Sequence, residues 1–238
     1  MLSNIETTLL SELVDAYPMA SKVLLTHGLD FCCGGQRSLL DACKESSVDI
    51  NLILQELQAI EVTPANQLWA NASNKDLIAH ILDYYHASLY NDLPYLDELL
   101  RQVLKSHLAK SPKLLNGLKD VFMSFSQELL EHMGKEEQVL FPWILSHQEQ
   151  KPTGPIHCMR IDHNRASRSL EQIATLTNGY KPPDEACATW RNLYAGLKVL
   201  DYKLRMHIHL ENNILFSRFT EKDHLRQNIC VTNSAISR

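Results

Sequence analysis

Histidine and glutamate recur four residues apart in two stretches of the chain, which share the order of these residues and a following Leu-Phe pair. The stretches read HMGKEEQVLF at 132–141 and HIHLENNILF at 207–216. Residues four apart project from the same side of an α-helix, so the His and Glu of each stretch can reach one point. Imidazole and carboxylate groups both bind divalent transition metals. The pattern therefore predicts a metal site with an internal twofold repeat.

Two more histidines extend this site to the other long helical segments of the chain. When each segment is written as a three-four repeat of core positions, an ionisable residue interrupts every apolar stripe at a similar height. Six polar side chains are then expected to point into one core. The predicted ligands are His86, His132, Glu136, His163, His207 and Glu211.

Any one of these residues could instead be a core side chain that is satisfied by ordinary hydrogen bonds. Hydrogen bonds alone explain the six residues together less well, because burying an unpaired charge costs several kcal/mol while a whole domain is stable by only ~5 to 15 kcal/mol. Six such residues in one layer need a common partner, and two divalent cations supply it. Acid-base pairing among the four imidazoles and two carboxylates is the alternative.

The types of ligand narrow the choice of metal. No cysteine lies on the stripes, so the site does not resemble a soft thiolate centre, and calcium or magnesium cages would not use four imidazoles. Iron, manganese and zinc remain. A carboxylate on each side of the twofold can bridge two ions, which favours a pair of redox-active irons over one tetrahedral zinc.

Cys32 and Cys33 are adjacent in the stretch HGLDFCCGG at 27–35. They follow a helix that is expected to end at glycine, and they precede one that Ser38 is expected to cap. Thiols near a helix N-terminus ionise more easily, so the two cysteines are predicted to act as a redox pair or as transient iron or sulfur ligands. The alternative is that they are ordinary buried cysteines.

The elements that must position these residues are all helical, because glycine is scarce and no run alternates like a strand. We expect an all-α fold, in which an antiparallel up-down four-helix bundle follows a small helical N-terminal domain. The domain boundaries are predicted at 1–60 for the small domain, 61–73 for a linker, 74–220 for the bundle and 221–238 for a tail. The four long helices are predicted at 74–105, 112–147, 154–177 and 183–219.

The composition of the 238 residues excludes some classes of partner. A net charge of -5 and a pI near 6.1 give no general attraction to nucleic acid or to an anionic membrane. The N-terminus lacks the features of a secretory signal, and no stretch has eighteen uncharged apolar residues. We therefore expect a cytoplasmic protein.

The motifs DFCCGG and LENNILF together resemble those of the repair of iron centres (RIC) family, whose C-terminal domain is hemerythrin-like. The resemblance covers essentially the whole chain. It implies two non-haem iron ions, with or without an oxo bridge, held by the six residues named above, with Glu136 and Glu211 as bridging carboxylates. The chain departs from the family pattern at Ser217, where proline is common, and in the tail after Arg218, and neither departure touches a ligand.

The resemblance implies a metal-binding stress-response protein that repairs iron-sulfur clusters damaged by nitric oxide or oxidants, as a donor of iron. Its partners would be damaged or apo iron-sulfur proteins, with nitric oxide or oxygen as a small ligand; a homodimer is left open. One alternative is an enzyme, a nitric oxide reductase that forms nitrous oxide at the di-iron centre. Another is an oxygen or nitric oxide sensor, although oxygen-carrying relatives use five histidines and only four lie on these stripes.

Overall fold

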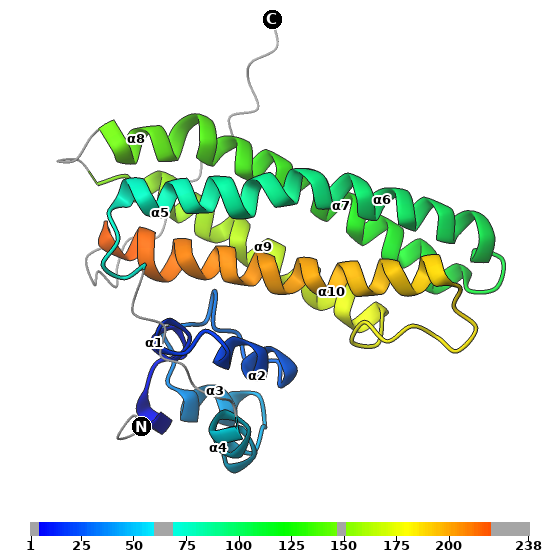
Figure 1. Cartoon of the computed structure of the whole chain (residues 1–238), viewed down its shortest axis with the longest axis horizontal. Helices are drawn as coiled ribbons and strands as arrows, with labels where there is room; N and C mark the ends of the chain where they lie inside the picture. Colours follow the sequence, from blue (N-terminus) through cyan, green and yellow to red (C-terminus); the bar gives the residue numbers. More distant parts are fainter. Residues whose placement is uncertain (1–4, 60–68, 147–150, 220–238) are drawn as a thin grey trace, which may run out of the picture.

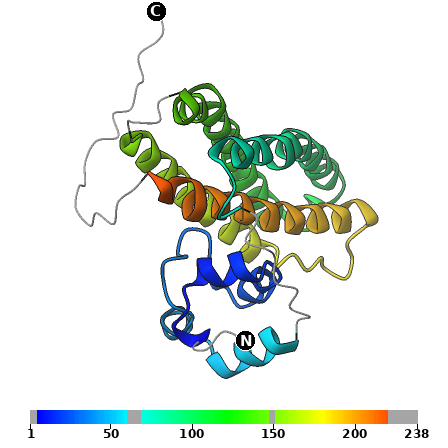
Figure 2. The ribbon, with the colours of Figure 1, turned by 60° about the vertical axis from the view of Figure 1, so that its left-hand side comes forward.

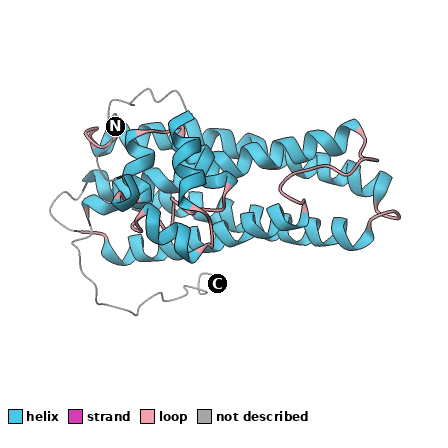
Figure 3. Ribbon diagram, turned by 90° about the horizontal axis from the view of Figure 1, so that it is seen from below, coloured by secondary structure: helices cyan, strands magenta, loops and turns pink. Residues whose placement is uncertain are grey.

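The computed structural model describes residues 5–59, 69–146 and 151–219. Within these ranges every regular element is a helix, and the one β-type pairing is an isolated bridge between Leu9 and Ser38 (Figure 3). The prediction of an all-α fold is therefore confirmed. None of the described helices combines the length and the apolar character needed to cross a membrane. The predicted tail at 221–238 and most of the predicted linker lie outside the described residues.

Four long helical rods lie side by side and alternate in direction, which confirms the antiparallel up-down bundle (Figure 1). The first rod contains α5 (Asn74–His80), η2 (Ile81–His86) and α6 (Ala87–His107). The second contains α7 (Pro112–Lys135), η3 (Glu136–Leu140) and α8 (Phe141–Ser146). The third is α9 (Thr153–Leu176), and the fourth contains α10 (Ala188–His209), η4 (Leu210–Leu215) and η5 (Phe216–Arg218).

Local sequence sets the ends of these rods. The Ser73 hydroxyl accepts a hydrogen bond of 3.1 Å from the amide of Asp76 and so caps α5, and Pro112 begins α7 where no amide donor is needed. The fourth rod begins at Ala188 and not at 183 as predicted. The chain first makes a turn in which the Ala186 amide donates to the carbonyl of Pro183 at 2.9 Å.

A small helical unit precedes the bundle and lies against its α10 side (Figures 1 and 2). It contains η1 (Ile5–Thr7), α1 (Leu10–Ala16), α2 (Ala20–Thr26), α3 (Leu39–Glu45) and α4 (Ile50–Ala59). Gly28 follows α2 with a φ of +69°. Its own amide donates to the carbonyl of Leu25 at 3.1 Å, and the amide of Leu29 donates to the carbonyl of Leu24 at 2.8 Å. This Schellman arrangement releases the chain into the segment that carries the two cysteines.

Two apolar clusters fill the interior, and the six predicted ligands lie between them along every rod. One cluster includes Leu89, Phe125 and Leu204, and it continues into the N-terminal unit. The other, at the far end of the bundle, includes Ile81 and Phe141. Because apolar side chains cover the polar layer from both ends, water can reach it only from the side.

A regular three-four repeat is wrong at the π-helical turns of the first and second rods, although on the fourth rod Ile214 is buried as that repeat expects. A three-four repeat that continues from Glu136 places Val139 in the core, but Val139 is 60% exposed, while Leu140 and Phe141 are buried. Leu82 on the first rod is only half-buried, while Ile81 and Tyr85 are buried. A π-turn, η3 in one case and η2 in the other, fits one extra residue into the helix, and so it shifts the buried face relative to the 3.6-residue period.

Candidate metal centre

The structure brings the six residues predicted as ligands into one layer at the centre of the bundle. Each side chain is at most 4% exposed. All four rods contribute: His86 ends η2, His132 lies in α7, Glu136 begins η3, His163 lies in α9, His207 lies in α10 and Glu211 lies in η4.

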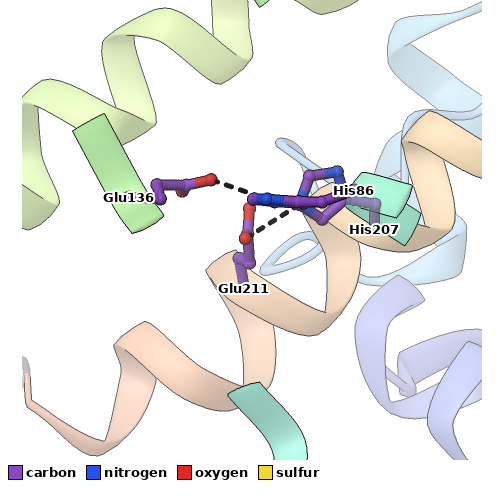
Figure 4. Close-up of side chains that lie close together, drawn as sticks. All are labelled: His86, Glu136, His207 and Glu211. Carbon is purple, nitrogen blue, oxygen red and sulfur yellow. Dashed lines mark hydrogen bonds and ion pairs between the residues drawn. The ribbon is translucent and has the colours of Figure 1, made fainter. Parts of the chain in front are cut away.

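These residues form two overlapping sets, and both glutamates belong to each set. In each set, one potential ligand atom from every member lies within 4.8 Å of the others. We call the first set position 1 (Figure 4) and the second set position 2. Position 1 contains His86 and His207 with both glutamates, and position 2 contains His132 and His163 with both glutamates.

Glu211 directs one carboxylate oxygen toward each position. Its Oε1 lies 2.8 Å from Nε2 of His207, and its Oε2 lies 3.0 Å from Nε2 of His163. A carboxylate placed in this way can share its two oxygens between two neighbouring cations. The side chain therefore has the arrangement that a bridging ligand requires.

Glu136 lies between the positions from the opposite side of the layer. Its Oε2 is 3.4 Å from Nε2 of His86 and 3.3 Å from Nε2 of His132. Neither carboxylate oxygen of Glu136 makes a hydrogen bond, although the side chain is fully buried. A buried carboxylate without donors is costly, so these oxygens fit a cation better than they fit a protein-only network.

Hydrogen bonds at Nδ1 determine which nitrogen two of the histidines present to the layer. Nδ1 of His86 donates to Oε1 of Glu137 at 2.8 Å, and Nδ1 of His163 donates to Oδ1 of Asn212 at 2.9 Å. Both acceptors are oxygens, so Nδ1 carries the proton in each neutral ring and Nε2 keeps its lone pair. Such outer contacts are common among histidines that bind metals.

The Nε2 atoms of the paired histidines face each other at short range. They are 3.2 Å apart in position 1 and 3.1 Å apart in position 2. Two lone pairs at this distance repel unless a proton or a cation lies between or beside them. With four imidazoles and two shared carboxylates, the donor set fits two divalent cations that accept nitrogen and oxygen ligands.

The hydrogen-bond acceptors at Nδ1 were missed by the sequence analysis, although the repeat contained a signal for them. Glu137 follows Glu136, and Asn212 follows Glu211, so the residue after each glutamate orients a histidine of another rod. The sequence places Glu137 about 100° around the helix from Glu136, and so away from the ligand position. It did not predict the contact with His86, because the contact joins two rods.

Three of the four rods make a π-helical turn at this layer, namely η2, η3 and η4, which contain or adjoin His86, Glu136 and Glu211. The wider turn leaves the helix locally less regular, and such turns occur frequently at functional sites. The third rod, which supplies His163, is α-helical throughout. Its buried residues follow the predicted period except at Ser167.

Charges within the layer oppose the effect of burial on its pKa values. Burial disfavours the protonated form of His132, but the carboxylates, Glu136 first among them, raise its pKa to about 10. Burial would raise the pKa of Glu211, yet His207 and His163 hold it well below its usual range. The pKa of His207 is lowered by burial. Without a cation, the layer is a set of buried ion pairs.

A pocket of about 70 Å³ opens beside position 2, between α7 and α9. Both histidines of position 2 line it, whereas its lining includes neither histidine of position 1. Carboxylates of Glu128, Glu131 and Asp162 also line it, together with Lys135 and Arg165. Among the described residues, this pocket gives the candidate centre a route to solvent.

The residues 30–35, which we call the cysteine loop, are shaped by one aspartate. Oδ1 of Asp30 accepts hydrogen bonds from the amides of Cys32 and Cys33, both at 3.0 Å, and Oδ2 accepts one from Gly34 at 3.1 Å. Both sulfurs also contact the hydroxyl of Ser167 on α9, at 3.7 and 3.5 Å. The loop thus holds two free thiols against the bundle.

The two thiols are unequal, and this corrects the expectation that a helix N-terminus favours ionisation of both. The hydrogen bond with Cys33, followed by complete burial, raises the pKa of Cys32 well above its ordinary value. The same hydrogen bond lowers the pKa of Cys33, which is only half-buried. Direct contacts in the loop, rather than α3, therefore separate the two cysteines.

Two histidines outside the layer have structural contacts. His209 is buried, and its Nε2 lies 2.8 Å from Oδ1 of Asp15 in the N-terminal unit. His107 packs against the ring of Trp190 with centroids 5.0 Å apart. The sequence could not show either partner, because both are distant along the chain.

Comparisons with known proteins agree with this arrangement. The hemerythrin HHE cation binding domain family matches residues 77–219, and a domain of unknown function, DUF542 (ScdA_N), matches residues 6–61. The chain is 40% identical over 209 residues to the iron-sulfur cluster repair protein YtfE of Cronobacter sakazakii, covering 88% of this chain and 94% of that protein. Proteins of the same name from Dickeya chrysanthemi and Yersinia pseudotuberculosis are 38% and 37% identical over 210 residues, covering 88% of this chain and 95% of each.

Proposed function

Because the chain belongs to the hemerythrin-like family of iron-sulfur cluster repair proteins, we propose that it repairs iron-sulfur clusters damaged by nitrosative or oxidative stress. It would do so in the cytoplasm, as a donor of iron to damaged or apo iron-sulfur proteins. The observation that carries this proposal is the position of the cysteine loop, which contacts the residue that orients His163. The candidate cation-binding layer and a pair of thiols thus lie next to each other.

Each part of the chain has a defined task in this proposal. The four histidines and two glutamates would hold two ferrous ions, with Glu136 and Glu211 shared between them. Bound iron supplies both the cargo and a redox-active centre. Cys33 presents the more acidic thiol, which suits it to accept iron or sulfur, while Asp30 fixes the backbone around it.

The test is transfer of iron to an apo iron-sulfur enzyme. The iron-loaded protein is mixed without air with the apo-enzyme, sulfide and an excess of ferrous chelator, and recovery of cluster absorbance and enzyme activity is followed. We expect faster recovery than an equal amount of free ferrous iron gives under the same chelator. The Cys32→Ser/Cys33→Ser variant should transfer more slowly, whereas Cys187→Ser, at an exposed cysteine, serves as the control. Equal recovery from free iron would refute the donor role.

A second candidate is nitric oxide reduction, which the sharing of both glutamates favours because it would hold two metals side by side. Anaerobic mixing of the di-ferrous protein with nitric oxide, followed by headspace analysis, separates the two functions. Formation of nitrous oxide and water from two nitric oxide molecules and two protons, with both ferrous ions oxidised to ferric ions, would support the enzyme. Its absence, together with successful transfer of iron, would leave the donor role alone.

A further inference from the structure

The two cation positions have different surroundings, and position 1 is the more enclosed. Its His207 is stacked on the ring of Tyr85 with centroids 5.6 Å apart, and its His86 lies 5.9 Å from the ring of Phe141. The charged carboxylate of Glu137 accepts a hydrogen bond from Nδ1 of His86. Rings thus lie against both of its histidines, whereas in position 2, among the described residues, a ring is stacked on His163 alone, that of Phe216 with centroids 5.9 Å apart.

Position 2 is more open and is connected to a different part of the chain. The pocket described above reaches both of its histidines. The carboxylates of Glu128 and Glu131 also line it, while that of Asp162 is paired with Lys135 at 3.0 Å and with Arg165 at 3.4 Å. The acceptor at its His163 is the neutral amide of Asn212, whereas position 1 has the charged Glu137 in the equivalent place of the repeat. A neutral acceptor makes the imidazole a weaker ligand than a carboxylate does.

Asn212 also joins position 2 to the cysteine loop. While its Oδ1 accepts from His163, its Nδ2 donates to the carbonyl of Cys32 at 3.2 Å and lies 3.9 Å from Sγ of Cys33. Ser167, one helical turn beyond His163, brings its hydroxyl to 3.5 Å from the same sulfur. A displacement of the loop is therefore passed to a predicted metal ligand through one side chain.

We infer that the ion held at position 2 is the exchangeable one, and that Asn212 is a positioning residue that couples its release to the cysteine loop. This inference rests on the proposed binding of two ions. It goes further by making the positions unequal and by naming the residue that links one of them to the thiols. Position 1 then retains its ion while position 2 supplies the cargo.

The experiment measures how fast iron leaves the protein. The full chain is loaded with ferrous iron without air and mixed in a stopped-flow instrument with a chromogenic ferrous chelator. We expect two phases of similar amplitude, a fast one from position 2 and a slow one from position 1. A chain that retains less than two equivalents of iron would contradict the proposed function, and a chain that retains two but releases them in one phase would contradict only this inference.

Matched variants assign the phases. Asn212→Ala removes the acceptor at His163, so the fast phase should accelerate by ~10-fold while the slow phase is unchanged. Glu137→Ala removes the acceptor at His86 and should accelerate only the slow phase by a similar factor. Asn212→Asp restores an acceptor, so the fast phase should return to the wild-type rate or below it. Acceleration of the same phase by both alanine variants would overturn the assignment.

A displaced loop tests the coupling. A Cβ at Gly35 would lie 2.4 Å from the carbonyl oxygen of Phe31, so Gly35→Ala must move the loop. We expect this variant to accelerate the fast phase, and we expect no further effect when it is added to Asn212→Ala. Gly154→Ala, where a Cβ meets nothing within 4 Å, is the control and should release iron at the wild-type rates. Additive effects of Gly35→Ala and Asn212→Ala would show that Asn212 does not carry the coupling.

Discussion

A neutral imidazole carries one N–H and one lone pair, so the contact at Nδ1 decides what Nε2 can bind. In this chain the residue after each shared glutamate supplies that contact, Glu137 for His86 and Asn212 for His163. One acceptor is charged and the other is neutral, although both occupy the same place in the repeat. Two positions built from the same ligands can therefore differ in how tightly they hold a cation.

Loss of a shared ligand should affect both positions, whereas loss of an unshared ligand should affect one. Glu211→Gln removes the negative charge that faces both positions, so bound iron should fall from roughly two ions to below one per chain. His86→Ala should leave about one ion, because it belongs to position 1 only. Metal analysis of the anaerobically desalted proteins measures both, with the exposed Glu98→Gln as the control. Equal losses in the Glu211→Gln and His86→Ala variants would contradict the sharing of Glu211.

The two cysteines should differ in reactivity. Because the pKa of Cys33 is lowered and that of Cys32 is raised, more Cys33 is thiolate at a given pH, and its side chain is also less buried. We expect iodoacetamide to modify Cys33 faster than Cys32. As the pH is lowered, modification of Cys32 should stop at a higher pH than modification of Cys33. Peptide mass spectrometry of timed samples measures both rates. Equal rates across the pH range would contradict this difference.

The helices reach the layer through π-turns, and this explains why the predicted stripe failed at particular residues. Up to Glu136 the second rod follows a 3.6-residue period, and beyond it the buried positions fall on Leu140 and Phe141 instead of Val139. The extra residue in the turn lets one helix place side chains both in the polar layer and in the apolar cluster at the far end of the bundle. The third rod has no such turn in its described range, and a regular repeat accounts for its buried residues except Ser167, which is buried where the repeat places Ala166.

Close packing of α6 against α10 depends on Gly196. A Cβ at this position would lie 2.6 Å from Cδ2 of Leu96, so Gly196→Leu must separate the two helices or displace the leucine. We expect the free energy of unfolding to fall by about 1–3 kcal/mol. Gly134→Ala is the control, because a Cβ there meets only the end of the Gln138 side chain at 4.0 Å. It should stabilise the helix by about 0.5–1 kcal/mol, and urea unfolding measures both effects.

In the whole molecule, the polar layer divides the interior of the bundle, and the N-terminal unit packs beside it. Asn213 donates to the carbonyls of Phe31 and Cys32 at 3.2 and 3.1 Å, and His209 pairs with Asp15. These contacts fasten the cysteine loop to the rod that supplies His207 and Glu211. The large apolar cluster crosses the same boundary, so we expect the two parts to unfold together.

Removal of metal should destabilise the whole molecule, because the layer then contains buried charges without cations. With free metal at 100 times its dissociation constant, each bound ion adds about 2.7 kcal/mol to the free energy of unfolding, which corresponds to roughly 5–11 °C in Tm per ion for a chain of this size. Thermal unfolding of the chelator-treated and the iron-loaded protein measures the difference. Magnesium, which prefers oxygen ligands, should not restore it. An unchanged Tm would mean that the layer is stable without metal.

Local periodicity was sufficient to predict the helical class, the four long rods and the six side chains that meet in the layer. Helical spacing is a property of the chain itself, and a His and a Glu four residues apart must share a face wherever the helix lies. The similarity of the stretches 132–141 and 207–216 also predicted that the site has two related halves. The adjacent cysteines were also recognised from the sequence, although their unequal pKa values were not.

Only the tertiary structure decided the contacts that join distant parts of the chain. Periodicity cannot show that Glu137 meets His86, that Asn212 joins His163 to the carbonyl of Cys32, or that a pocket reaches only one pair of histidines. These contacts depend on how the rods and the N-terminal unit pack, and a π-turn shifts the contacting face in a way that a regular period does not anticipate. The candidate ligands were therefore predictable from their spacing, whereas the different surroundings of the two positions were not.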